Sequence, residues 1–134
     1  MVLPILLMLT FGIWATARAW NVNNTMQHSA REAARYGATV DPWDPTDPNG
    51  SPDAVRAVAD ADLSGSSVDP LVIGDCIEFV ATSASPVCNV IHTNNTNADQ
   101  IYVQLTYQDY PLNFLFFSVD IDMHASAISR FEAP

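Results

Sequence analysis

Residues 2–17, VLPILLMLTFGIWATA, run without a break into residues 18–37, RAWNVNNTMQHSAREAARYG, and this stretch decides the fold. The first part is apolar and uncharged, whereas the second part is amphipathic. Together they predict one helix over residues 1–37, which at about 1.5 Å per residue would measure roughly 55 Å, nearly twice the hydrocarbon thickness of a bilayer. We therefore expect the first half to span a membrane and the second half to carry a domain outside it.

The water boundary of this helix is expected near residues 16–20. Trp14 and Trp20 flank Arg18, as the aromatic belt and the snorkelling cation of a membrane interface do. Two other interpretations stay open, namely a buried core helix and a cleaved signal peptide, for which the alanines of residues 15–19 imitate a cleavage site. Arg18 interrupts those alanines and no basic residue precedes the apolar run, so the sequence favours the span.

Small residues recur along the helix at spacings of three and four. The expected packing positions are Gly12, Ala15, Ala19, Ala30 and Ala34. Such a stripe lets helix backbones approach closely, which is how helices associate in lipid. We expect it to pack against the helices of other subunits, although alanine is also simply a good helix former.

The same helix resembles the amino-terminal signature of TadE-like proteins, the pseudopilins of the tight-adherence (Flp) pilus machinery. The family pattern is a leucine-rich span beginning with VLP, then an arginine, then a segment similar to AAREGARY. The matching positions here are Arg18, Ala30, Arg31, Glu32, Ala34, Arg35 and Tyr36. The segment HASAISRFE, residues 124–132, also resembles the last strand of the family.

This resemblance implies a pilin-like α+β fold and a minor pseudopilin that acts in pilus assembly, surface attachment and biofilm formation. It implies other pilin or pseudopilin subunits and the assembly machinery as partners, and a mechanism of packing with no chemical step. Two features depart from the pattern. Ala15 replaces an acidic residue that the family often carries in the span, and the prepilin-peptidase signal, a Gly with a Glu five positions later, is absent. These departures leave processing and filament entry open.

Composition sets limits on function. The chain has 134 residues, 49% of them hydrophobic, so about 95 residues remain for one domain after the helix. Its 15 acidic residues against five basic ones give a net charge of −10. Because phosphate binding requires clustered cations, nucleic acid is not an expected partner. The sequence carries no hydrolase, zinc-protease or phosphate-loop motif, so we expect no enzyme, no cofactor and no small-molecule substrate.

Residues 38–50, ATVDPWDPTDPNG, are predicted to form an acidic, proline-rich linker. In a polyproline II conformation Asp41, Asp44 and Asp47 would align on one face, where their oxygens could hold Ca²⁺. Their spacing departs from that of an EF-hand loop, so a solvated linker is favoured. A permanently anchored extracellular binding domain, using this loop or the aromatic bend of residues 114–117, is the alternative function.

Residues 51–134 are predicted to form the extracytoplasmic α+β domain. Residues 51–65, SPDAVRAVADADLSG, predict a short helix that begins at the N-cap Ser51, ends at Gly65 and lies against a sheet. Alternating apolar residues predict three or four antiparallel strands in a meander. Their expected ranges are residues 75–82, 86–93, 101–108 and 118–129.

Cys76 and Cys88 fall on neighbouring predicted strands. A disulfide between them would contribute about 3 kcal/mol and would imply an oxidising compartment. This supports an extracytoplasmic domain, although Arg18, Arg31 and Arg35 all follow the span and a positive-inside count would place the domain in the cytoplasm. Reduced core thiols are the alternative.

One further constellation is Asp120, Asp122 and His124, which alternation puts on one face of the last predicted strand. These residues could bind a metal in an extracytoplasmic metalloenzyme. A solvated strand face is the commoner explanation, so no metal site is predicted. Glu32 is placed to pair with His28 or Arg35, and His28 is otherwise expected to be an ordinary surface residue.

Overall fold

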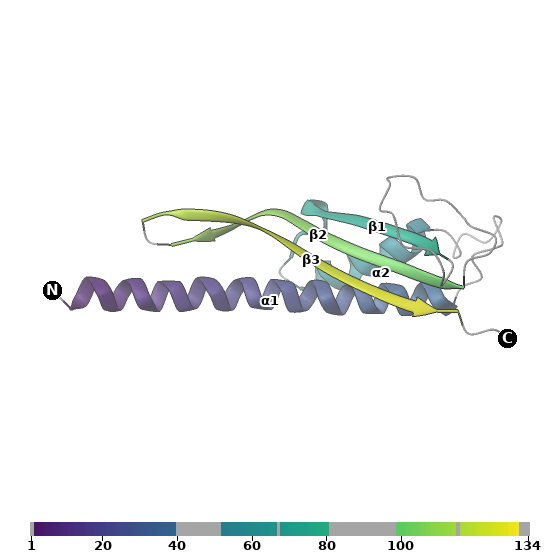
Figure 1. Cartoon of the computed structure of the whole chain (residues 1–134), viewed down its shortest axis with the longest axis horizontal. Coiled ribbons are helices and arrows are strands. Elements are labelled where there is room, and N and C mark those ends of the chain that lie inside the picture. The colour runs from purple at the N-terminus through teal and green to yellow at the C-terminus, as the bar shows by residue number, and fades with distance from the viewer. Residues whose placement is uncertain (1, 40–51, 67, 81–98, 115, 132–134) are drawn as a thin grey trace.

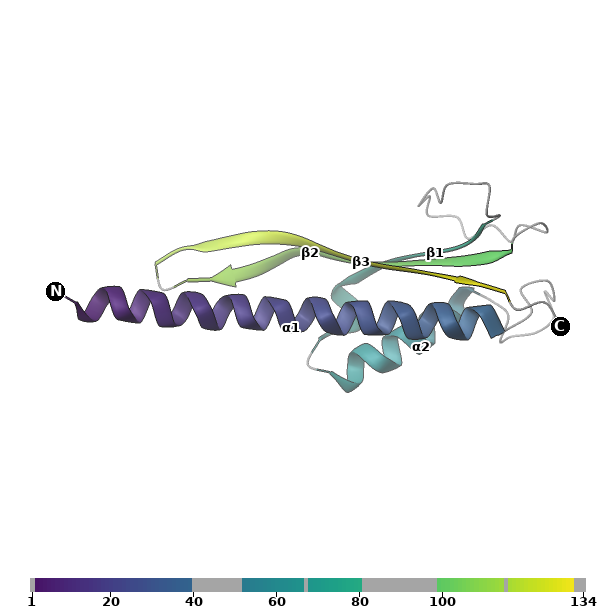
Figure 2. The same cartoon turned by 60° about the horizontal axis from the view of Figure 1, so that its bottom comes forward.

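The computed structural model of the chain describes residues 2–39, 52–66, 68–80, 99–114 and 116–131. A long helix, α1 (Leu3–Thr39), extends along the length of the molecule. A sheet lies along one side of α1 and a short helix, α2 (Pro52–Gly65), lies on the other side (Figures 1 and 2). The predicted α+β class, with a long first helix and a short second one, is confirmed.

The sheet has three antiparallel strands in the order β1-β2-β3, so the predicted meander is confirmed in the described residues. The elements after α2 are a single 3₁₀ turn, η1 (Pro70–Val72), and the strands β1 (Ile73–Val80), β2 (Gln100–Asn113) and β3 (Ser118–Arg130). The predicted strand of residues 86–93 lies outside the described residues.

The hairpin formed by β2 and β3 is much longer than β1. The β1 pairing ends at Ile73 opposite Tyr107, whereas the β2–β3 pairing continues to Asn113 opposite Ser118. Figures 1 and 2 show this outer part of the hairpin beside the amino-terminal half of α1. Pro111 is tolerated there because β1 no longer pairs with β2 at that level.

A bulge divides the hairpin. Ile101, Val103 and Leu105 face inward, as alternation predicts, but the register shifts between Tyr107 and Tyr110, and Tyr110 becomes the next buried residue. Asp109 at this bulge has a φ of 54°, in the left-handed region. Its backbone N–H donates to Asp122 Oδ1 on β3 at 3.0 Å. A local backbone feature therefore resets which side chains of the outer hairpin face α1.

The core forms where the carboxyl-terminal half of α1 meets α2 and the sheet. Its members on the two helices are Ala19, Val22, Met26, Ala30, Ala33, Ala34, Val55, Ala59 and Leu63. Its principal strand members are Ile77, Ile101, Val103, Leu105, Met123 and Ala125. The short helix α2 contacts β1, as expected of a helix against a sheet, but it packs mainly on α1, because α1 already covers the inner face of β2 and β3.

The first helix, predicted over residues 1–37, continues to Thr39. Gly37 therefore lies inside it, against β2 and α2. A Cβ atom at this position would collide with Ile101 Cδ1 and lie 3.1 Å from Val55 Cγ2. The absence of a side chain thus lets α1 approach β2 and α2 closely.

Candidate membrane and assembly surface

The amino-terminal half of α1, residues 3–17, is called here the apolar half, and residues 19–39 the domain half. Large side chains of the apolar half are exposed, with Leu3, Ile5 and Leu9 showing 72%, 64% and 62% of their surface. Among the described helices, α1 has the length and apolar composition needed to cross a membrane. Such exposure argues against the buried core helix, because a soluble surface rarely carries so large an apolar patch.

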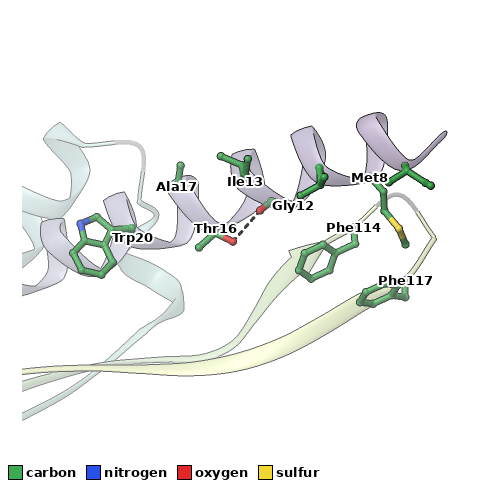
Figure 3. A pocket seen from close by; sticks show the side chains of 10 residues that line it. Met8, Gly12, Ile13, Thr16, Ala17, Trp20, Phe114 and Phe117 are labelled. Carbon is green, nitrogen blue, oxygen red and sulfur yellow. Dashed lines mark hydrogen bonds between the residues drawn. The ribbon is translucent and has the colours of Figure 1, made fainter. Parts of the chain in front are cut away.

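The hydroxyl groups in the apolar half have partners within the helix. Thr10 Oγ1 donates to the carbonyl oxygen of Leu7 at 2.9 Å, and Thr16 Oγ1 donates to that of Gly12 at 2.8 Å (Figure 3). A hydroxyl group without a hydrogen-bond partner costs on the order of several kcal/mol in hydrocarbon. These bonds make both threonines compatible with a lipid environment.

Aromatic residues and a cation gather at one level of the molecule, where the apolar half ends. The Arg18 Cζ lies 5.8 Å from the centre of the Trp14 ring. On the hairpin, the rings of Tyr107 and Tyr110 pack edge to face with centroids 5.1 Å apart. All four side chains line one small hollow of about 200 Å³. We call these four side chains the aromatic belt. The belt coincides with the water boundary predicted near residues 16–20.

The hairpin and α1 flank an apolar groove of about 850 Å³ that extends from Ile5 in the apolar half to Trp20, just after Arg18. Its lining includes Met8, Gly12 and Ile13 of α1, with Phe114 and Phe117 of the hairpin (Figure 3). The two phenylalanine rings are stacked with centroids 4.8 Å apart. The backbone N–H of Phe114 donates to the carbonyl of Phe117 at 2.8 Å.

The small-residue stripe lies beneath the chain's own sheet and second helix. Ala15, Ala19, Ala30 and Ala34 are buried, and Gly12 is half-buried beside Phe114. The stripe is therefore occupied within this chain, and packing of the same positions against other subunits stays a prediction. Most of the large apolar side chains in the apolar half remain exposed.

Comparison with known families gives one result for this helix. Residues 1–35 match the TadE-like protein family. The predicted resemblance is thus confirmed over the amino-terminal segment, which forms the apolar half and most of the domain half of α1. No curated protein and no solved structure that was compared matches the chain.

The residues of the TadE-like motif lie mostly on the outer face of α1. Arg18, Arg31, Glu32 and Arg35 are exposed, and Tyr36 is half-buried against the core. In the described part of the chain no ion pair joins Glu32 to His28 or Arg35. The motif charges therefore remain available at the surface of the TadE-like segment.

His28 has a partner that sequence reasoning missed. Its Nδ1 lies 3.1 Å from Asp62 Oδ2 on α2, and the buried Ser29 Oγ donates to the same oxygen at 2.7 Å. The hydrogen bonds from Ser29 and His28 lower the pKa of Asp62 below its ordinary value. Serine, histidine and aspartate also form hydrolase triads, but there the histidine contacts the serine, whereas here the aspartate stands between them. The cluster joins α1 to α2.

A second link was also unforeseen. Arg56 of α2 pairs with Asp75 of β1, and its Nε lies 3.4 Å from Asp60 Oδ2 one turn along. Ion pairs over such sequence separations leave no local pattern, so no signal in the sequence identifies the Asp75 partner.

The three residues considered as metal ligands, Asp120, Asp122 and His124, are exposed on β3. Asp122 accepts the hydrogen bond from the Asp109 N–H at the bulge, and His124 Nδ1 lies 3.2 Å from Thr106 Oγ1. The described residues contain no group of three His, Cys, Asp or Glu suited to a metal ion. Cys76 lies on β1 and is half-buried.

The partner predicted for Cys76, Cys88, lies outside the described residues, and so do Asp41, Asp44 and Asp47. The disulfide and the calcium loop therefore stay predictions.

Proposed function

We propose that this chain is a TadE-like pseudopilin, a membrane-anchored structural or assembly subunit of a tight-adherence (Flp) pilus system that serves surface attachment. One observation carries the proposal: the segment that matches the family, residues 1–35, is a single continuous helix whose first half exposes large apolar side chains. A helix of this kind is suited first to lipid and then to packing among other helices.

The domain half of α1 supports this mechanism because it is joined to the rest of the chain. Met26, Ala30 and Ala33 are fully buried between the sheet and α2, and Ser29 is bonded to Asp62. Helix and domain would therefore move as one body. When the subunit enters a filament, its apolar half would exchange lipid acyl chains for the helices of other pilin subunits, with no chemical step.

An extracytoplasmic domain is part of the proposal. The net charge of −10 suits a solvated outer surface, and a disulfide between Cys76 and Cys88 would form in an oxidising compartment. Mass shift on alkylation, with and without prior reduction of intact cells, tests both statements. Alkylation of both thiols without reduction would argue against this orientation.

The proposed function is tested by expressing the full chain in its own host, shearing the cells and washing the membranes with carbonate. Recovery in the sheared filaments supports a filament subunit, and retention in washed membranes supports an anchored assembly subunit or the alternative binding domain. Release by carbonate contradicts membrane anchoring altogether.

A matched pair of variants sharpens this test. Leu9→Asp places a charge on the exposed face near the middle of the apolar half, where a charge costs about 3 kcal/mol in a bilayer, whereas Leu9→Ile keeps the face apolar. We expect Leu9→Asp to weaken membrane retention and Leu9→Ile to leave it unchanged.

A further inference from the structure

The outer end of the β2–β3 hairpin carries exposed aromatic residues that the proposed function does not use. This hairpin tip comprises residues 112–114 and 116–119. Phe116 exposes 74% of its surface, Phe117 51% and Val119 44%. The tip contains no charged residue. Three large apolar side chains are thus exposed within four residues, a patch that favours an apolar neighbour.

The hairpin tip begins at the aromatic belt, where Leu112 and Asn113 line the hollow, and extends toward the amino terminus of α1. A Cβ atom at Gly12 would be 3.9 Å from Phe114 Cε1, so the phenylalanine ring contacts α1 at that level. Gly12 precedes Arg18 by six residues, which corresponds to about 9 Å along the helix. Phe117 lines the groove together with Met8, a further turn from the belt (Figure 3).

The charges of the outer hairpin stop at the belt. Asp120 pairs in register with Pro111, which lines the same hollow as Trp14 and Arg18. Asp109 and Asp122 meet at the bulge, further from the tip. Along the molecule, charged residues of the hairpin thus end at the level of Arg18, where the charged residues of α1 also end.

We propose that the hairpin tip inserts into the outer leaflet beside the α1 span, with lipid acyl chains filling the apolar groove. The inference rests on the membrane anchoring in the proposed function, and it adds a second point of contact with the bilayer. The partner is lipid because the groove continues the apolar half of α1, and because uncharged residues begin on both elements at the level of the belt.

Backbone hydrogen bonding limits the depth of this insertion. The inner edges of β2 and β3 pair with each other, but β1 ends opposite Tyr107, and no described strand pairs with the outer edge of β2 beyond that residue. Open strand edges require water or another partner. The open edge therefore confines insertion to the short hairpin tip, whose Phe114 lies at the level of Gly12, about 9 Å from the belt. This depth falls in the range known for interfacial helices.

The test uses the full chain reconstituted in vesicles of phosphatidylcholine and phosphatidylglycerol. A nitroxide is attached to one introduced cysteine, Phe116→Cys at the tip, Ile13→Cys on the span or Ser126→Cys on the exposed face of β3. All three positions are exposed, so each substitution leaves the core intact. The unmodified chain, treated with the same reagent, gives the background from Cys76 and Cys88. The measurement is the accessibility of the label to oxygen, which favours lipid, and to a nickel complex, which favours water.

We expect positions 13 and 116 to be more accessible to oxygen than to nickel, and position 126 to show the reverse order. If position 13 is in lipid while position 116 favours nickel, the tip lies in water, and the inference is wrong although the anchor stands. If position 116 excludes both reagents, a protein surface such as a second copy covers it, which also overturns lipid contact. If position 13 favours nickel, the proposed anchoring itself fails and the inference falls with it.

Discussion

In the domain half of α1 small side chains lie beneath the sheet and α2, whereas in the apolar half large apolar side chains point away from the chain. Ala30 and Ala33 are fully buried, but Ile5 and Ile13 expose 64% and 67% of their surface. The difference shows that one helix meets two kinds of packing. Small residues allow close approach where the chain packs on itself, with Met26 filling the core between them, and large apolar residues remain exposed in the apolar half.

This comparison also revises the meaning of a small-residue stripe. Such stripes are associated with packing between separate helices in lipid. Here the buried stripe permits close approach to the chain's own β3, whose facing residues include Ala125. The surface of α1 that remains exposed comprises its large apolar side chains and Arg31, Glu32 and Arg35.

The largest contrast is expected between two methionines of the same helix. Met26 is fully buried, so Met26→Ala should lower the free energy of unfolding by about 2–5 kcal/mol through lost burial and a cavity. Met8 exposes 46% of its surface, so Met8→Ala should cost less than about 1 kcal/mol. Urea unfolding of the full chain in detergent, followed by near-ultraviolet circular dichroism, measures both. Equal losses of unfolding free energy would mean that Met8 and Met26 are buried to the same extent.

The two glycines of α1 should respond with opposite signs. Gly37→Ala forces a methyl group against Ile101 and Val55, an overpacking cost of about 1–3 kcal/mol that exceeds the gain of about 1 kcal/mol in helix propensity. Gly12→Ala meets Phe114 at ordinary contact distance, so it keeps that gain. Thermal unfolding of both variants checks the signs. Stabilisation by Gly37→Ala would refute the close approach of α1 to β2.

Removal of the carboxylate that joins α1 to α2 should have an intermediate effect. Asp62→Ala leaves the buried hydroxyl of Ser29 without its acceptor, at a cost of about 1–3 kcal/mol. Asp60→Ala removes a partly exposed ion pair with Arg56, but Arg56 retains its ion pair with Asp75. This change should cost less than about 0.5 kcal/mol. Both values come from urea unfolding, and similar losses would indicate that Ser29 finds another partner.

The bulge that separates the hairpin tip from the rest of the sheet can be tested at Asp109. Because its φ is 54°, Asp109→Val should destabilise the chain by about 1–2 kcal/mol, whereas Asp109→Gly should be nearly neutral. In the vesicle experiment Asp109→Val should also shift the label at position 116 toward water. An unchanged unfolding free energy in both variants would argue against the left-handed conformation.

The smallest expected effect is on acid stability. Hydrogen bonds from Ser29 and, to a smaller extent, His28 lower the pKa of Asp62 in the folded chain. The ionised Asp62 side chain therefore contributes fully to stability above the ordinary carboxyl pKa. This contribution is lost as the pH falls through the lowered folded pKa, roughly below pH 4. Asp62→Asn should therefore flatten the fall in unfolding free energy in that range, relative to the unmodified chain. If the unfolding free energies of Asp62→Asn and the unmodified chain fall in parallel with pH, the hydrogen bonds of Ser29 and His28 do not favour the ionised form of Asp62.

Much of the secondary structure was predictable because its signals are local. The two helices and the strands beginning near Ile73, Gln100 and Ser118 follow apolar periodicity. The length of β2 was underestimated, since Pro111 and the bulge at Asp109 interrupt the alternation. Pairing with β3 carries the strand past both interruptions.

The candidate surface was predictable only in part. The sequence identified Trp14, Trp20 and Arg18 as the boundary. The structure places Tyr107 and Tyr110 beside Trp14 and Arg18, whereas Trp20 lines the apolar groove. Those tyrosines alternate within an ordinary strand pattern, so their place beside α1 leaves no local signal.

The sequence by itself determined the long helix, its apolar half and the TadE-like signature, because hydropathy, length and motif spacing are properties of neighbouring residues. Tertiary structure alone decided that Phe114 lies against Gly12 and that Ser29 bonds to Asp62. These contacts join residues far apart in the chain, and an apolar or polar residue does not encode which distant partner it will meet. The hairpin tip therefore became a candidate membrane contact only once the fold had placed it beside the span.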